Sequence, residues 1–263
     1  MQTEHLTQFK AWFDAYTRTY LIGDPVADSP LALKIAHTTR VCGNMEQLAR
    51  AIDMHDDQIR IAETVGLFHD IGRFEQYRRY QTFNDRESTN HATLGIDELK
   101  KAAVLDPLPA TEQTSIVEAI RFHNTPALPN GMPPPRMVFM RMIRDADKLD
   151  IWKVFADYYR HERRPEAVVF QHLPDLPTWE TAIVDAIAAK RMARLQDMKS
   201  LIDLKLLHLS WVFDLHFRET FVQARKRGDL AMIARTLPDA PDVRQAVSRA
   251  MDRLAEMQTT NPA

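Results

Sequence analysis

Apolar side chains recur at steps of three and four residues along most of the chain, which is the spacing of one face of an α-helix. In residues 31–53, Leu33, Val41, Met45 and Leu48 form such a stripe, and His37 lies within it. No stretch alternates between polar and apolar residues over a convincing length. The pattern therefore predicts an all-α protein. Further helices are expected at 4–22, 58–70, about 89–99, 110–124, 136–160, 179–196, 198–227, 229–236 and 241–257.

Segments rich in proline or polar residues separate the predicted helices. The loop TPALPNGMPPPR holds five prolines and should be stiff, because each proline fixes its backbone. Residues 73–90 have no clean period and predict a loop or an irregular short helix, and 169–178 are rich in turn-forming residues. Gly72 is expected to stop the helix before it. No internal repeat occurs, so one domain over residues 1–263 is predicted.

The amino-acid composition supports the all-α class and excludes some functions. Glycine is scarce, with 7 residues, and the formal net charge is -2, which gives no basic field for extended nucleic acid. The single cysteine allows no internal disulfide and fits a reducing compartment. The first residues lack the pattern of a signal peptide, and no apolar run is long enough for a membrane span. We therefore expect a cytoplasmic protein.

Two His-Asp pairs stand in different surroundings. His55-Asp56 lies in the polar stretch DMHDDQ at a predicted helix start, where helix capping explains it. His69-Asp70 instead closes the apolar run VGLF and precedes Ile71. Burying an imidazole and a carboxylate there costs several kcal/mol unless they pair or bind a metal. The second pair is therefore the candidate for chemistry.

The predicted helix 136–160 also carries carboxylates toward its apolar side. On a helical wheel, Asp147 falls at the edge of the apolar arc and Asp150 near its centre. With His37, His69 and Asp70, Asp147 makes a plausible mixed nitrogen and oxygen site for a divalent transition metal. The opposite side of the wheel, expected to face solvent, holds Arg141, Arg144, Asp145 and Lys148.

The order of these segments resembles that of the HD superfamily of metal-dependent phosphohydrolases. The resemblance rests on IAHTT at 35–39, LFHDIGR at 67–73 and DADKLD at 145–150, and it spans about 31–155. It implies an HD-domain helical bundle as the core. The additional C-terminal helices at about 179–257 match no known motif and are expected to pack on this core.

The resemblance also implies roles for individual residues. His37, His69, Asp70 and Asp147 would hold a divalent transition metal (Mn, Fe, Co, Ni or Zn), and Asp150 would support a ligand without touching the ion. Two further histidines are candidate ligands of a second ion. NHATLG and IRFHN resemble the extra histidines of members that hold two ions, so Asp70 would bridge and the second ion would add His91 and His123.

Each added histidine has a structural alternative. His91 falls in the first turn of its predicted helix, and His123 could act as a cation at a helix C-terminus. Asn124 also stands where dinuclear HD-GYP phosphodiesterases have a second adjacent histidine, and the GYP signature is absent. These departures argue against a cyclic-dinucleotide substrate and predict that a second ion binds more weakly than the first.

Candidate substrate contacts lie close to the His-Asp pair. Arg73 could clamp a phosphate with two hydrogen bonds and act with Asp70 in catalysis. Lys148 could assist, although the wheel places it toward solvent. A lid that stacks on a base and binds phosphate, or equally a solvated charged loop, could form from Tyr77, Arg78, Arg79 and Tyr80.

Three functions remain open. The favoured one is a phosphohydrolase, either a phosphomonoesterase or a phosphodiesterase, in which a metal-activated water attacks a small phosphorylated molecule, with a nucleotide preferred. The second is a di-iron oxygenase of the HD type. The third is a non-catalytic nucleotide-binding regulatory module, which the intact ligand set disfavours.

Overall fold

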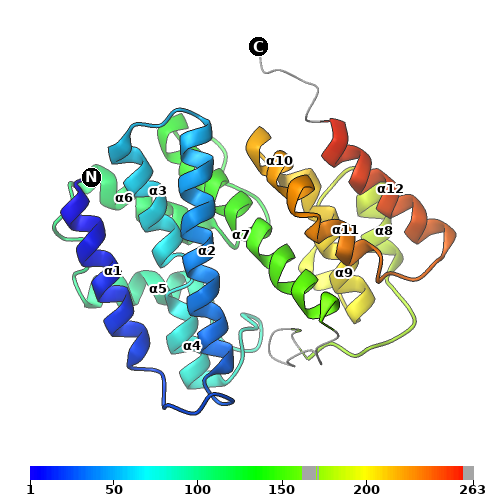
Figure 1. Cartoon of the computed structure of the whole chain (residues 1–263), viewed down its shortest axis with the longest axis horizontal. Coiled ribbons are helices and arrows are strands. Elements are labelled where there is room, and N and C mark those ends of the chain that lie inside the picture. Colours follow the sequence, from blue (N-terminus) through cyan, green and yellow to red (C-terminus); the bar gives the residue numbers. More distant parts are fainter. Residues whose placement is uncertain (162–169, 171, 257–263) are drawn as a thin grey trace. The chain divides into compact units, whose positions relative to one another are not determined.

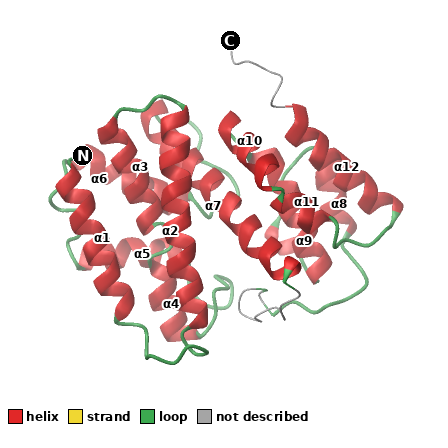
Figure 2. Cartoon of the chain, viewed as in Figure 1, coloured by secondary structure: helices red, strands yellow, loops and turns green. Residues whose placement is uncertain are grey.

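The computed structural model describes residues 1–161, 170 and 172–256, and these contain helices and loops but no β-strand (Figure 2). The all-α prediction is confirmed. Tertiary contacts divide the chain into two compact units, Met1–Asp147 and Lys148–Ala263. One domain over the whole chain, with the C-terminal helices packed on the core, stays a prediction.

The first unit contains six complete helices and the beginning of a seventh, which are labelled α1 to α7 in Figure 1. Helices α2 and α3 are antiparallel neighbours joined by a short turn, so the early part of α2 lies beside the end of α3. At Gly66 an added Cβ would lie 3.1 Å from Met45 Cγ and 3.2 Å from Cys42 Cα, so glycine permits this close packing. The helices are α1 (Thr3–Arg18), α2 (Ser29–Ala51), α3 (Asp56–Phe68), α4 (Gly72–Tyr80), α5 (His91–Lys101), α6 (Ala110–Phe122) and α7 (Pro134–Arg160), the last continuing into the second unit.

Gly72 begins a helix, so the prediction that it stops one is wrong. An added Cβ at this position would lie 2.1 Å from the His91 carbonyl oxygen and 2.5 Å from Gly95 N. Glycine is required here because α4 and α5 nearly touch. Much of the segment 73–90, predicted as irregular, is the regular helix α4. Asn90 caps α5 by accepting a hydrogen bond from Thr93 N.

The start of α7 is anchored to its neighbours by polar side chains. Asn44 Nδ2 on α2 donates to the Ala146 carbonyl at 2.9 Å, and Arg144 donates to the Thr125 carbonyl at 2.5 Å. The wheel wrongly placed three charged residues toward solvent, because it assumes one polar side and α7 has few exposed positions. Arg141 is exposed as predicted, but the buried residues are Arg144, Asp145 and Lys148.

The second unit has its own apolar core, built from the later part of α7, from helices α8 to α12 and from the second of two short 3-10 helices. The continuous helix predicted at 198–227 is wrong: the backbone changes to a 3-10 turn at Trp211 and is extended at Leu215. Both Val212 and Leu215 are buried by this change. The predicted helix 179–196 is likewise shorter. The elements are α8 (Thr181–Ala188), η1 (Leu195–Asp197), α9 (Leu201–Ser210), η2 (Trp211–Asp214), α10 (Arg218–Arg227), α11 (Asp229–Ala234) and α12 (Pro241–Glu256).

Among the described residues, no helix combines the length and the apolar character needed to cross a membrane.

Candidate metal centre

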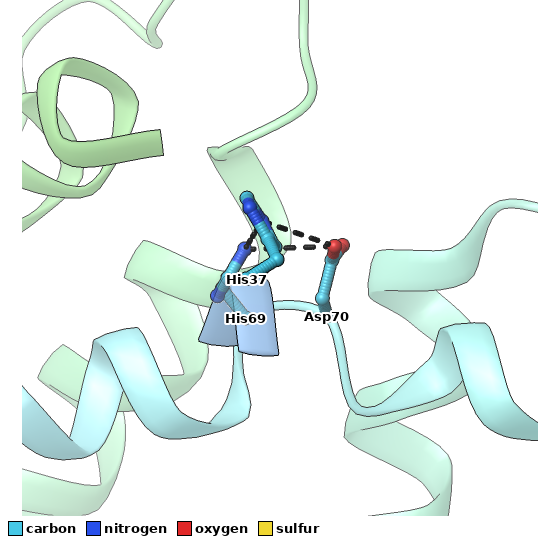
Figure 3. A group of neighbouring side chains, drawn as sticks. All are labelled: His37, His69 and Asp70. Carbon is cyan, nitrogen blue, oxygen red and sulfur yellow. Dashed lines mark hydrogen bonds and ion pairs between the residues drawn. The ribbon is translucent and has the colours of Figure 1, made fainter. Parts of the chain in front are cut away.

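Three buried side chains from α2 and the end of α3 point at one another (Figure 3). His37 lies on α2, His69 caps the C-terminus of α3, and Asp70 follows it directly. His37 Nε2 lies 3.3 Å from His69 Nε2, and both nitrogens lie 3.6 Å from Asp70 Oδ2. The dipeptide thus delivers two ligand atoms to the same place as a histidine from another helix.

Asp147 joins this first group from α7. Its Oδ1 lies 3.2 Å from His37 Nε2 and 3.8 Å from His69 Nε2. The hydrogen bond between Asn44 and the Ala146 carbonyl holds the adjacent backbone against α2. The four side chains predicted for the first metal therefore lie together within the first unit.

The two remaining predicted ligands lie on the other side of Asp70. His91 is the first residue of α5 and His123 caps the C-terminus of α6. Asp70 Oδ1 lies 3.2 Å from His91 Nε2 and 3.8 Å from His123 Nε2, and the two histidine nitrogens lie 2.9 Å apart. One oxygen of Asp70 faces each group, which is the arrangement of a bridging carboxylate.

The hydrogen bonds of the histidine Nδ1 atoms, which point away from the centre, indicate whether the inward Nε2 atoms carry a proton or a lone pair. His69 Nδ1 bonds to the Gly66 carbonyl at 2.8 Å, and His123 Nδ1 bonds to the Ile120 carbonyl at 2.6 Å. A carbonyl only accepts, so each Nδ1 carries the proton and each Nε2 carries a lone pair. His91 Nδ1 likewise donates to the Asp85 carboxylate, so the lone pairs of His91 Nε2 and His123 Nε2 face each other at 2.9 Å and repel unless a cation binds them. The donor set fits a divalent metal.

Electrostatics favour the protonation states that bind metals. Burial lowers the pKa of His69, and it lowers that of His123 to about 3, so both are neutral at pH 7. Burial alone would raise the pKa of Asp70, but the Lys34 ammonium, with help from the Arg73 guanidinium, holds it well below its usual range. Burial opposes the ionisation of Asp147 as well, and the hydrogen bond with His37 lowers its pKa. Neutral imidazoles and ionised carboxylates are the ligand forms.

Asp85 orients the second group, and sequence reasoning did not identify it. Its carboxylate lies 2.7 Å from His91 Nδ1 and accepts hydrogen bonds from Gln76 at 2.8 Å and from Asn124 at 3.1 Å. A carboxylate on the outer nitrogen of a histidine ligand fixes its tautomer and ring orientation. Asp85 lies in the loop before α5, and nothing in the spacing of that loop distinguishes it. Asn124, read from the sequence only as a missing ligand, supports this carboxylate.

Two cations approach Asp70, and one of them was unexpected. Arg73 Nε lies 3.4 Å from Asp70 Oδ1, but Arg73 Nη1 donates to Gln76, the Phe83 carbonyl and Asp85. The guanidinium thus fastens the loop after α4, which competes with its predicted role as a phosphate clamp. Lys34, three residues before His37, donates to Asp70 Oδ2 at 2.6 Å. That helical spacing is the sequence signal that could have identified it.

The other predicted substrate contacts lie elsewhere. Tyr77 packs its ring on Phe83, with the centroids 5.1 Å apart. Arg78 and Arg79 lie on α4 and both pair with Glu75. These residues are therefore helical, and the lid they were proposed to form stays a prediction.

In the second unit, Lys148 donates to Asp214 Oδ2 at 2.5 Å, an interaction that competes with substrate binding. Asp150 is buried there, with 1% of its surface exposed, and its support of a ligand stays a prediction.

Two structural alternatives can now be judged. His123 is buried and its pKa is lowered to about 3, so the interpretation as a helix C-terminal cation is wrong. His55 and Asp56 stand at the start of α3 as expected, but no side-chain hydrogen bond caps that helix.

Comparison with known proteins gives one result. Residues 35–159 match the family model described as the HD domain. No curated protein and no solved structure matches the chain significantly.

Proposed function

Because residues 35–159 form an HD domain, we propose that this chain is a metal-dependent phosphohydrolase that acts on a small phosphorylated molecule, with a nucleotide as the favoured substrate. The observation that carries the proposal is the position of Asp70, whose two oxygens face two separate groups of buried histidines. Such a carboxylate suits two ions held side by side, as phosphoryl chemistry often requires.

The ligands divide between the two ions. His37, His69, Asp70 and Asp147 would hold the first, and Asp70, His91 and His123 the second. Bound divalent ions would polarise a phosphoryl oxygen and lower the pKa of a coordinated water. Because the second group offers only three side chains, room remains for water and substrate beside it.

The residues around the ligands have separate tasks. Asp85 holds the His91 ring in the tautomer that turns Nε2 inward. Arg73 places a positive charge 3.4 Å from Asp70 Oδ1, which keeps that carboxylate ionised and adds to the attraction for an anionic substrate. The buried histidines exclude bulk water, so charges at the centre act through a low dielectric.

A substrate screen tests the proposal. The full chain, loaded separately with manganese, cobalt, iron, nickel or zinc, is incubated with p-nitrophenyl phosphate, bis-p-nitrophenyl phosphate and nucleoside mono-, di- and triphosphates, and product release is measured. We expect hydrolysis of at least one class and its loss in His69→Ala. His55→Ala, altered outside the site, should keep the activity. Hydrolysis that persists in His69→Ala, or no hydrolysis with any metal, would contradict the proposal.

A second candidate is an oxygenase of the di-iron HD type. Its support is the completeness of the second group, in which His91 and His123 both turn Nε2 toward Asp70. The same panel separates the two functions when oxygen consumption by the iron-loaded protein is followed. Oxygen uptake that depends on a phosphorylated compound and releases no hydrolysis product would favour the oxygenase.

A further inference from the structure

Lys34 stands at the more exposed side of the first ligand group. Its ammonium donates to Asp70 Oδ2 at 2.6 Å, the same oxygen that faces His37 and His69. The Lys34 side chain is 19% exposed, whereas the side chains of His37, His69 and Asp70 are at most 5% exposed. Only Asp147, at 21%, is comparably open among the ligands of this group. Lys34 and Asp147 are therefore the side chains here that a solute can contact most readily.

The two cations near Asp70, Arg73 and Lys34, differ in how many of their hydrogen-bond donors are already bound. Arg73 Nη1 is held by three acceptors, Gln76, the Phe83 carbonyl and Asp85. The Lys34 ammonium has three donor hydrogens, and the hydrogen bond to Asp70 uses one of them. Lys34 can therefore donate to an anion without releasing Asp70.

An aromatic ring limits where the ammonium can go. Lys34 Nζ lies 5.4 Å from the centroid of the Phe83 ring, within the range of a cation–π interaction. Tyr77 packs on the Phe83 ring and supports it. The ammonium is thus kept beside Asp70 by a carboxylate and by an aromatic face.

On this geometry we propose that Lys34 binds a nonbridging oxygen of the phosphoryl group of the substrate beside the first ligand group. The inference rests on the proposed phosphohydrolase function and adds a residue that recognises the substrate. It assigns to Lys34 the phosphate contact that the sequence assigned to Arg73. The substrate class is a phosphate ester whose phosphoryl group is within reach of the ammonium and the first ion together.

The test compares neutral and charged replacements in the metal-loaded full chain. Lys34→Met and Lys34→Gln remove the charge, and Lys34→Arg keeps it. Lys101→Met, at an exposed position on α5, is the matched control. Two quantities are measured for each protein: metal content by mass spectrometry, and the affinity for inorganic phosphate by titration calorimetry.

We expect both neutral variants to keep the metal content of the wild type and to bind phosphate roughly 10- to 100-fold more weakly, the effect of losing one charge-assisted hydrogen bond. Lys34→Arg should stay within a few-fold of the wild type, and Lys101→Met should not differ from it. Unchanged phosphate affinity in the neutral variants would overturn the proposal. Metal loss that accounts for the weaker phosphate binding would also overturn it, because Lys34 would then support the metal ligands.

Phosphate binding separates this inference from the proposed function. A wild type that binds phosphate through Lys34 but hydrolyses no ester would refute the hydrolase and leave the assignment of Lys34 standing. If the wild type hydrolyses esters and Lys34→Met does so with the same KM, the hydrolase stands and the assignment of Lys34 is refuted. If the metal-loaded wild type does not bind phosphate, the Lys34 proposal fails.

Discussion

Asp145 and Asp147 stand two residues apart on α7 and have different surroundings. Asp147 Oδ1 lies 3.2 Å from His37 Nε2, whereas Asp145 is fully buried and is not part of either ligand group. The helical wheel predicted that Asp145 faces solvent. Because the position is buried, we now expect a cost in stability.

The two Asn substitutions should therefore separate metal binding from folding. Asp147→Asn removes a ligand charge, so it should lower the metal affinity of the first group and abolish most of the activity. The midpoint of thermal unfolding should change little. Asp145→Asn should lower the free energy of unfolding by about 1–3 kcal/mol, because a buried polar contact is disturbed, and should keep its metal. Metal titration and thermal unfolding of both variants decide the matter. Metal loss in Asp145→Asn alone would reverse the assignment.

Asp85 acts on the second group through His91. Removing the carboxylate in Asp85→Ala frees the imidazole to rotate and to change tautomer, so the affinity for the more weakly bound ion should fall about 10- to 100-fold. The tightly bound ion should remain, since no ligand of the first group contacts Asp85. Competition with a chelator, followed by metal analysis, measures both affinities. Equal weakening of both ions would show that Asp85 supports the fold as a whole rather than His91.

At the scale of the helices, the sequence predicts structure best where apolar side chains recur at helical spacing. It predicts structure worst where contact with an element distant in sequence determines the backbone. The stripe in α2 and the run that ends at His69 placed their ligands on the correct faces, because each helix buries one side. Gly72 was misread, since its reason is the backbone of α5, which is distant in sequence. The break near Leu215 was missed for the same reason: core packing overrides a continuous helical pattern.

Replacement of Gly72 tests whether close packing of α4 and α5 positions His91. A Cβ would lie 2.1 Å from the His91 carbonyl oxygen, so Gly72→Ala must push the start of α5 away from Asp70. We expect loss of the second ion and a destabilisation of about 1–3 kcal/mol, typical of overpacking. Gly43→Ala on α2 is the control, because its Cβ would meet no atom within 4 Å. Full occupancy of the second group in Gly72→Ala would show that α5 tolerates the displacement.

At the scale of the whole molecule, each compact unit has its own source of stability. The second unit buries His208, whose ring lies 4.4 Å from Phe155 and 4.6 Å from Trp211 between ring centroids. Its Nδ1 has no hydrogen-bond partner among the residues that the structure describes, and burial lowers the pKa of His208 to about 3. The neutral imidazole is therefore part of an aromatic cluster, and protonation acts against it.

The stability of the second unit should consequently depend on pH through His208. Below a pH of about 6.5 the His208 side chain binds a proton in the unfolded chain but not in the folded one. The contribution of neutral His208 to stability is therefore fully present above that pH and is lost as the pH falls toward 3. At pH 5 the loss attributable to His208 is about 2 kcal/mol.

Tryptophan fluorescence can follow this unfolding, because Trp152, Trp179 and Trp211 all lie in the second unit. The difference in stability between pH 7.5 and pH 5 should shrink in His208→Leu and stay unchanged in His161→Gln, which alters an exposed histidine. An equal pH dependence in His208→Leu would refute this role.

Metal stoichiometry is the most direct test of the dinuclear centre. The purified full chain, loaded and then freed of excess metal, should hold between one and two transition-metal ions, and the number should rise toward two when metal is added. Asp70→Ala should lose both ions, because this carboxylate faces both groups, while His91→Ala should lose only the weaker one. His55→Ala should match the wild type. Full occupancy in Asp70→Ala, or a wild type that holds no transition metal after loading, would contradict a metal centre built around Asp70.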